Sequence, residues 1–467
     1  MEYGRDFDFS RPFFDQFADL LRVVPHSALA ILGDNENSDY TNDNYKSKNC
    51  YLIFDGEQAE SCYHGETFVN IKNSLDFLFL NDSEQCYQCT VCHNCYNLKY
   101  SQFSQNCSDS WFLKDCIGVR NSFGCINLRN KEYYIFNEPH TKESYEAFIQ
   151  AFKSSSHAQV LAMQKKVNDF FATQPLRAIR GIQNQNVVGD NLNNCKNAYE
   201  CYDGYDLQDC RYCTDCLMGA KDCLDVHVWG DGMENCYNSL LVGASIRNIM
   251  SSIYVIKGCS DVAYSLWCLQ NSQDLLGCVS LRHKQYCILN KQYSKEDYFD
   301  LRAKIVEHMK KTGEWGQFFP IQKSFFGYNE TIANEYYPLT KNEALKQGWT
   351  WSDYEVSVQA ERVIPASRLP DDINDIPNDI LNWAIECEAT GKPFKVIAQE
   401  LKFYRDHHLP IPRRHPDVRH ADRLALKNPY HLVEINCHNC QKEVQTSHPN
   451  PKEKVIFCDD CYYKLVN

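Results

Sequence analysis

The chain has 467 residues, a formal net charge of −13 and a hydrophobic content of 43%. That hydrophobic content supports a folded core and excludes a disordered chain, and the charge excludes binding of nucleic acid or anionic membrane over the whole surface. No apolar run reaches the roughly 18 residues of a membrane helix, and the first residues lack the features of a signal peptide. We therefore expect a cytoplasmic protein with reduced thiols and no membrane contact.

Residues 1–36 are predicted to form a helical or extended N-terminal arm, after which a cysteine-rich region begins. Twenty of the 25 cysteines lie between Cys50 and Cys287, and twelve of these directly follow Asn, Asp or Gly. Those three residue types tolerate the left-handed backbone of a tight turn, and cysteine is small and usually buried. The sequence therefore predicts a repeated sharp corner followed by an inward-pointing residue. The twelve are Cys50, Cys95, Cys107, Cys116, Cys125, Cys195, Cys210, Cys216, Cys223, Cys236, Cys259 and Cys278.

The spacing of the cysteines predicts a stacked β structure. Six pairs lie nine residues apart (86/95, 107/116, 116/125, 201/210, 259/268 and 278/287), and nine residues make one short strand and one corner. Two such segments predict a repeat of about 18 residues, near the scale of known solenoids. Cys107 would then stack over Cys125, and Cys116 under Tyr134. We predict a mainly β fold, a duplicated parallel β-solenoid (β-helix-like), with residues 37–140 and 184–293 as its cysteine-rich halves.

A run of cysteines inside the first half is a second, weaker candidate for a metal site. Cys86, Cys89, Cys92 and Cys95 follow one another at intervals of three, and Cys210, Cys213 and Cys216 repeat the spacing. Such runs can ligate zinc or an iron–sulfur cluster. The alternative, which we favour, is that they are structural thiols at solenoid corners.

An internal duplication links the two halves. Asn121–Phe148 and Asp274–Leu301, 153 residues apart, are identical at 11 of 28 positions without a gap, which indicates an internal repeat. Thr141 and Ser294 are the expected N-caps of a helix after each half, and Gly313 the expected end of the second helix. We expect a helical insert at 141–183 and a capping helix with an extended segment at 294–348, which would cover open sheet edges.

Residues 349–431 are predicted to be a linker and a degenerate zinc-knuckle module. Cys387 and His415 lie where a second pair of knuckles would place ligands, but Thr390 and Val418 occupy the other positions, so we expect a helical module without metal. The segment 395–431 is locally basic, with eight Lys or Arg against four Asp or Glu. It could contact nucleic-acid phosphates, although a solvated helix face is the commoner explanation. The candidate contacts are Arg413, Arg414, Arg419 and Arg423.

The C-terminal segment, 432–467, carries the most specific motif. Cys437-x-x-Cys440 and Cys458-x-x-Cys461 are two C-x-x-C knuckles separated by 17 residues, the pattern of a zinc ribbon. A module of this size does not fold without an additional cross-link such as a disulfide or a bound metal ion. Four thiolates leave no open coordination position, so we expect one structural Zn²⁺.

Five longer motifs resemble the uncharacterised cysteine-rich zinc-ribbon proteins of candidate-phyla-radiation (Patescibacteria) bacteria. They lie at 3–13, 124–133, 286–296, 307–316 and 326–330, and the resemblance covers nearly the whole chain. It implies a repeat body followed by zinc modules, and it implies no activity. Relatives tend to have complete knuckles where this chain has Thr390, His415 and Val418, which implies that one zinc site has been lost here.

These observations favour a non-enzymatic interaction or scaffold protein, because repeats and structural zinc are present and no assembled catalytic motif is. We expect a protein partner, and homo-oligomerisation is compatible with the sequence. The first alternative is binding of nucleic acid or the ribosome through the ribbon and the 395–431 segment. The second is a β-helix enzyme that acts on a polysaccharide, for which the acidic corners at Asp203, Asp206 and Asp209 would line a groove.

Overall fold

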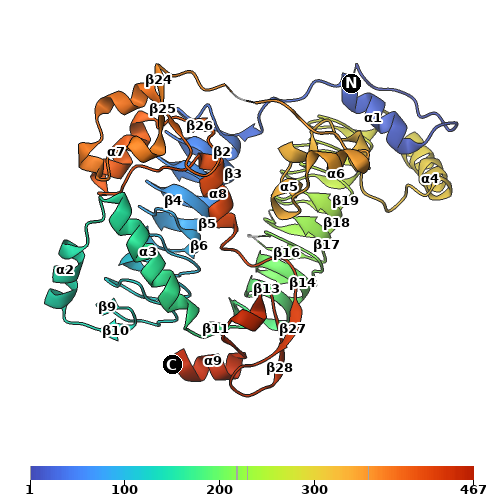
Figure 1. Ribbon diagram of the computed structural model, residues 1–467. Coiled ribbons are helices and arrows are strands. Elements are labelled where there is room, and N and C mark those ends of the chain that lie inside the picture. Colours follow the sequence, from blue (N-terminus) through green and yellow to red (C-terminus); the bar gives the residue numbers. More distant parts are fainter. Residues whose placement is uncertain (1, 217–218, 229, 356, 467) are drawn as a thin grey trace.

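The computed structural model describes residues 2–216, 219–228, 230–355 and 357–466. Two large sheets of mainly parallel strands stand side by side, and helices lie along their flanks and at their ends (Figure 1). The first sheet runs in the opposite direction to the second, so the start of one lies near the end of the other. The fold is therefore mixed α/β with two large parallel sheets.

The first sheet has eight strands, which pair at a constant offset of 12 residues except for the first pair, Ile31 with Asn44, where the offset is 13. Tyr51 pairs with Tyr63, and Tyr63 with Leu75. The offset persists between β7 and β8, where Tyr96 pairs with Ser108. The strands are β1 (Ile31–Leu32), β2 (Asn42–Lys48), β3 (Tyr51–Glu60), β4 (Tyr63–Lys72), β5 (Leu75–Glu84), β6 (Thr90–His93), β7 (Tyr96–Lys99) and β8 (Ser108–Trp111).

This 12-residue offset corrects the predicted 18-residue repeat. The neighbour of Cys107 in the next level is Val119, whose N–H donates to Cys107 Sγ (3.4 Å), and not Cys125. The corners themselves were correctly predicted, because the Asn, Asp or Gly before each of the twelve cysteines has a positive φ. Positive φ recurs at every third residue, also at Val91 and Phe103. A repeat of 12 residues therefore has four corners, and two cysteines nine residues apart are separated by three of its four sides.

The second sheet has twelve strands with a less uniform register. The offset is 11 between Gln185 and Lys196 and 13 between Arg247 and Ser260. The strands are β12 (Gly181–Ile182), β13 (Gln185–Asn193), β14 (Lys196–Tyr205), β15 (Leu207–Gln208), β16 (Ala220–Lys221), β17 (Leu224–His227), β18 (Met233–Leu240), β19 (Arg247–Met250), β20 (Ser260–Ala263), β21 (Gln273–Leu276), β22 (Gln285–Ile288) and β23 (Lys291–Gln292).

The interior of both repeat regions is filled by small residues that follow the corners. All 25 cysteines lie in the described part of the chain as free thiols, and 24 of them are buried. Phe77 fits into this interior because the residue opposite it is glycine. A Cβ on Gly65 would lie 2.3 Å from the ring of Phe77, its partner one level on. The cysteines of the two repeat regions therefore serve as small core residues.

The predicted duplication appears as two end elements with equivalent strand pairing and hydrogen bonds. β9 (Tyr134–Ile135) and β10 (Glu138–Pro139) pair through Ile135 and Glu138, and β22 and β23 pair through the residues 153 positions later. The side chain of Asn137 bonds both the N–H and the C=O of Ile126, and Asn290 bonds Val279 in the same way.

A helix follows each of these elements, as predicted. These are α2 (Lys142–Ala151) and α4 (Lys295–Thr312). Thr141 and Ser294 cap them, and Gly313 ends α4 in a left-handed conformation. α4 packs beside α1 (Phe13–Val23), whose N-terminus is capped by the carboxylate of Glu314 through the N–H groups of Phe13 and Phe14 (2.9 and 2.7 Å).

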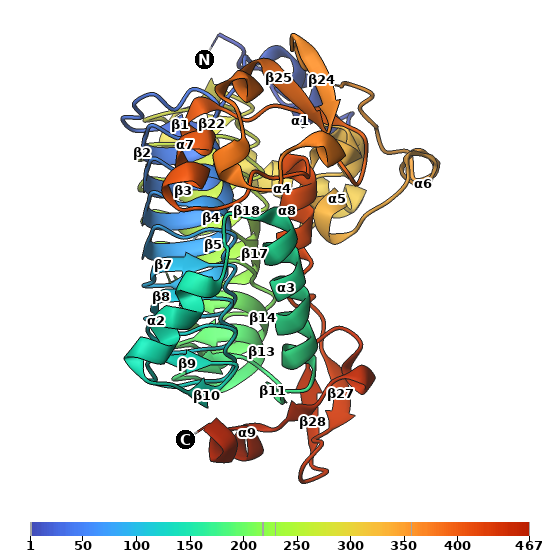
Figure 2. The same cartoon turned by 60° about the vertical axis from the view of Figure 1, so that its left-hand side comes forward.

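The remaining elements connect or flank the sheets. α3 (His157–Ala172) runs along the first sheet, as Figure 2 shows. None of the helices in the described ranges has the length and hydrophobicity that crossing a membrane requires. The other elements are β11 (Leu176–Arg177), α5 (Ala333–Tyr336), α6 (Lys341–Lys346), β24 (Arg362–Pro365), β25 (Trp383–Glu386), β26 (Pro393–Phe394), α7 (Ala398–Asp406), α8 (Pro416–Leu424), β27 (Val433–Asn436), β28 (Glu443–Thr446), β29 (Ile456–Phe457) and α9 (Asp459–Val466).

Candidate metal centre

The first two C-terminal cysteines lie on the hairpin between β27 and β28. The N–H of Cys437 donates to Lys442 O (2.8 Å), and the N–H of Gln441 donates to Cys437 O (2.9 Å). Gln441 has a φ of 61°, a left-handed conformation that closes the turn after Cys440. The turn therefore places two thiols three residues apart on one compact knuckle.

The second pair lies where β29 enters α9. Cys458 directly precedes α9, and Cys461 lies in its first turn. The N–H of Cys458 donates to Cys437 Sγ (3.2 Å), and Asn439 Nδ2 donates to Cys461 Sγ (3.2 Å). Hydrogen bonds from N–H groups stabilise a thiolate, the form that binds metal.

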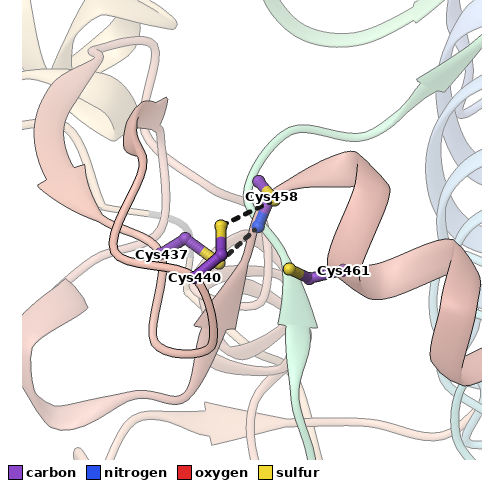
Figure 3. A group of neighbouring side chains, drawn as sticks. All are labelled: Cys437, Cys440, Cys458 and Cys461. Carbon is purple, nitrogen blue, oxygen red and sulfur yellow. Dashed lines mark hydrogen bonds between the residues drawn. The ribbon is translucent and has the colours of Figure 1, made fainter.

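The four sulfur atoms are close enough to share one metal ion. Each lies within 4.8 Å of the other three, and Figure 3 shows the four side chains converging from the hairpin and the helix. Cys440 Sγ and Cys458 Sγ are 3.6 Å apart. A zinc–sulfur bond of about 2.3 Å in a tetrahedron puts neighbouring sulfurs about 3.8 Å apart. The cluster therefore fits a metal ion in size and in donor type, and four protein ligands would fill its coordination sphere.

The thiols of the cluster do not share one pKa. Burial raises the pKa of Cys437, but the N–H groups of Cys440, Cys458 and Asn439 outweigh it and lower the value to about 6. The N–H of Cys461 lowers the pKa of Cys458, yet burial and the neighbouring thiols raise it to about 12. Crowded thiolates repel one another, and a cation at their centre removes that repulsion.

The cluster is attached to the rest of the molecule through its second knuckle. β29 pairs in parallel with β11, which lies in the connection between the two large sheets. Arg177 of β11 forms a two-bond ion pair with Asp459 (2.8 and 2.9 Å). The hydroxyl of Tyr462, next to Cys461, donates to Asn127 Oδ1 of the first repeat region (2.9 Å). A metal at this cluster would therefore stabilise a junction as well as a small module.

Residues 383–424 form a companion module with the same local geometry as residues 433–466. β25 and β26 pair through Ile385 and Phe394, and β27 and β28 pair through the residues 50 positions later. The N–H of Cys387 donates to Lys392 O (3.0 Å), and the N–H of His415 donates to Cys387 Sγ (3.2 Å). The degenerate knuckle pair predicted from the sequence is therefore a structural copy of the C-terminal module.

The companion module has other residues at the ligand positions. Thr390, His415 and Val418 stand where the C-terminal module has Cys440, Cys458 and Cys461. His415 caps α8, since its Nδ1 accepts from the N–H of Asp417 (3.1 Å). Of these three residues, only His415 is of a type that commonly ligates a metal, and its Nδ1 is already occupied by this hydrogen bond.

The run of Cys86, Cys89, Cys92 and Cys95 occupies consecutive inward positions within one 12-residue repeat. Each thiol is buried. Cys89, Cys92 and Cys95 donate to the carbonyl oxygens of residues nine positions on, at 3.4–3.7 Å. The groups with mutually close ligand atoms found among the described residues do not include this run. The structure thus gives these thiols main-chain partners.

The four candidate arginines have different surroundings. Arg419 and Arg423 of α8 are 5% and 4% exposed, and both guanidinium groups contact the buried carboxylate of Asp76 in β5. Burial leaves these two no surface at which nucleic acid could touch them. Arg413 donates to carbonyl oxygens at Leu369 and Pro370. Arg414 pairs with Asp422 at the surface, so the prediction of nucleic-acid contact stays untested for these two alone.

A third group of ligand-type side chains was not foreseen from the sequence. His420 Nε2 lies 3.0 Å from a Glu335 oxygen and 3.4 Å from a Glu66 oxygen. Burial lowers the pKa of His420, but the hydrogen bond that its ring donates to Glu335 and the charges of both glutamates outweigh it and raise the pKa. The three residues come from α8, α5 and β4, and no sequence spacing signals their proximity.

Comparison with known proteins does not assign the chain to a family. No protein-family model matches the chain, and no curated protein matches it. The sequence and the structure together define a cysteine-rich protein with two large parallel sheets and a C-terminal four-cysteine cluster that could hold a metal ion.

Proposed function

We propose that the chain is a non-enzymatic interaction protein, in which two β-solenoids form a rigid body and a zinc ribbon fastens their junction. The observation that carries this proposal is the position of the four-cysteine cluster. Four ligands leave no open position for a substrate, and β29 beside the cluster pairs with the segment between the sheets. The metal in this proposal is structural. The protein is cytoplasmic, because free thiols persist in that compartment.

Pairing outside the main sheets supports the solenoid. Isolated parallel bridges continue the 12-residue offset on other sides of the first repeat region, as in Thr90↔Gln102↔Lys114↔Ile126 and His93↔Gln105↔Ile117↔Arg129. With a corner at every third residue, one turn has four sides of three residues. Such a turn buries one side chain per side, which explains why small residues recur every third position.

An exposed apolar segment supports a protein partner. Phe325 and Phe326 are 52% and 51% exposed, with ring centroids 4.4 Å apart. Concentrated apolar exposure of this kind marks protein–protein contact sites. We propose that the segment 321–345 is the contact surface for another protein. Its exposed large apolar side chains are Ile321, Phe325, Phe326, Ile332, Tyr337 and Leu345.

Two measurements test the proposal. Elemental analysis of the purified chain should find about one zinc per chain, and Cys437→Ser, which leaves three thiolates, should lose it to a chelator far faster than the wild type. Phe325→Asp with Phe326→Asp should abolish the recovery of a co-purifying protein. Tyr199→Asp with Tyr212→Asp, a pair that is 43% exposed at each residue, should not change that recovery. Turnover of a small substrate by the purified chain alone would refute the non-enzymatic assignment.

Action on a polysaccharide is a second candidate, favoured by one observation. A broad polar groove follows the outer face of the first repeat region, where Asn70 donates to Asp82 and Asn94 to Asn106 at successive levels. Tyr96, which is 44% exposed, lies in the same groove and offers a ring on which a sugar could stack. Binding to a glycan array, lost in Tyr96→Ala, would support this candidate over the protein-partner surface.

The zinc ribbon and the repeat body also support membership in the cysteine-rich zinc-ribbon proteins that the five sequence motifs resemble. Metal analysis of one such relative with complete knuckles should find about one zinc more per chain than in this protein.

A further inference from the structure

A cavity of about 160 Å³ lies where the two sheets and the C-terminal helix meet. Its walls come from the first sheet (Phe79 and Asn81), the second sheet (Asn193 and Tyr205) and α9 (Tyr462). Junctions between structural units are frequent places for small-molecule sites. An apolar cavity of roughly 150 Å³ suffices for benzene, so this one has room for a ligand of a single ring.

The lining combines flat aromatic walls with positive charge. Phe103 lies under the guanidinium of Arg180, 3.7 Å from the ring centroid, and Tyr205 faces His93 with ring centroids 6.3 Å apart. Three arginines and one aspartate line the cavity. Arg180 Nε forms an ion pair with Asp115 Oδ1 (2.9 Å), whereas Arg180 Nη1 lies 3.8 Å from Asp190 Oδ2. Arg177 is paired with Asp459 outside the cavity, whereas Arg180 keeps one nitrogen, Nη1, without a hydrogen bond. Aromatic walls beside such a guanidinium group favour a flat anion.

Several lining side chains carry polar atoms without a partner among the described residues. They are Asn81 Oδ1, His93 Nδ1, Arg180 Nη1 and Asn193 Nδ2. Asn193 is 5% exposed and the Arg180 side chain 10% exposed. A buried polar atom without a hydrogen bond costs about 1–3 kcal/mol. The two strongest of these groups, the Arg180 guanidinium and the Asn193 amide, are donors, and a carboxylate supplies acceptors for both.

We propose that this cavity binds a small monocyclic aromatic carboxylate, with its ring between the aromatic walls and its carboxylate toward Arg180 and Asn193. The site is separate from the 321–345 surface but borders the metal cluster, because the lining residue Tyr462 directly follows Cys461. A ligand here would contact both sheets and α9, so its binding would stabilise the junction by linkage.

Benzoate is the probe, with benzamide as its neutral analogue and benzamidine as its cationic one. Calorimetric titration of the metal-loaded chain should show binding of benzoate and at least about tenfold weaker binding of benzamide and benzamidine. The informative variant is Asn193→Asp. Asn193 Oδ1 already accepts from Ile182 N–H (3.2 Å), so Asp keeps that bond and replaces only the free donor with negative charge.

Asn193→Asp should weaken benzoate binding at least about tenfold and reverse the preference in favour of benzamidine. Asn49→Asp is the matched control, because Asn49 Oδ1 also accepts one hydrogen bond, from Asn37 (3.1 Å), far from the cavity. It should leave benzoate binding unchanged. No benzoate binding at about 10 mM, equal binding of all three probes, or a benzoate-soaked crystal with only water in the cavity would each overturn the proposal.

Discussion

The substitution Asp76→Asn tests whether a buried ion cluster holds the companion module on the first sheet. Asp76 is fully buried, and its carboxylate contacts Arg419 and, at 3.2 Å, Arg423 Nη1. Removing one partner of a buried ion pair costs about 3–5 kcal/mol, because the remaining charge stays buried without compensation. Glu400 lies 3.7 Å from Arg419 and keeps part of that compensation. We therefore expect the lower end of the range, about 3 kcal/mol.

Urea unfolding followed by tryptophan fluorescence measures this loss, and limited proteolysis reports whether residues 383–424 are released first. Arg414→Ala is the control, since the pair of Arg414 with Asp422 is 40% and 45% exposed and should cost at most about 1 kcal/mol. If Asp76→Asn and Arg414→Ala lowered the free energy of unfolding equally, with no earlier cleavage of the companion module, the buried cluster would not be what holds the module in place.

Three further outcomes are expected. Cys458→Ser should release the metal to a chelator far faster than the wild type, because it leaves three thiolates; unchanged release would contradict a four-ligand site. The raised pKa of His420 means that its ion pairs stabilise the fold fully below pH about 6.5 and less as pH rises through the folded-state pKa. The difference in melting temperature between wild type and His420→Ala should therefore shrink at alkaline pH, and a constant difference would argue against the ion pairs. The triple substitution Thr390→Cys, His415→Cys and Val418→Cys in the companion module should add about one zinc per chain. Serine at the same three positions should add none.

The sequence was most informative where the relevant residues are close together in the chain. The four-cysteine cluster was predicted because each knuckle spans only four residues. The corners were predicted at Asn94 and Asp115, since these residue types favour a left-handed backbone. The repeat length was wrong because Val91 and Phe103 also adopt positive φ, and no residue preference signals those corners.

Long-range pairing explains what the sequence could not supply. Arg419 and Arg423 belong to a basic segment that suggests a surface, but their partner Asp76 lies 343 residues from Arg419. Only the fold brings that carboxylate to α8. The same holds for Glu66, Glu335 and His420, which come from three separate elements.

The pairing of β29 with β11 has a consequence for the order of events during synthesis. The ribosome completes the entire second sheet before it makes Ile456 and Phe457, so β11 emerges long before its partner strand exists. Each stack can grow level by level as it leaves the exit tunnel, because each new level pairs with the level made just before it. The junction, by contrast, must remain open until the last segment has emerged. Maturation of this protein should therefore end in a late closing step that follows the formation of both stacks, and a metal ion bound by the four cysteines would stabilise the closed junction.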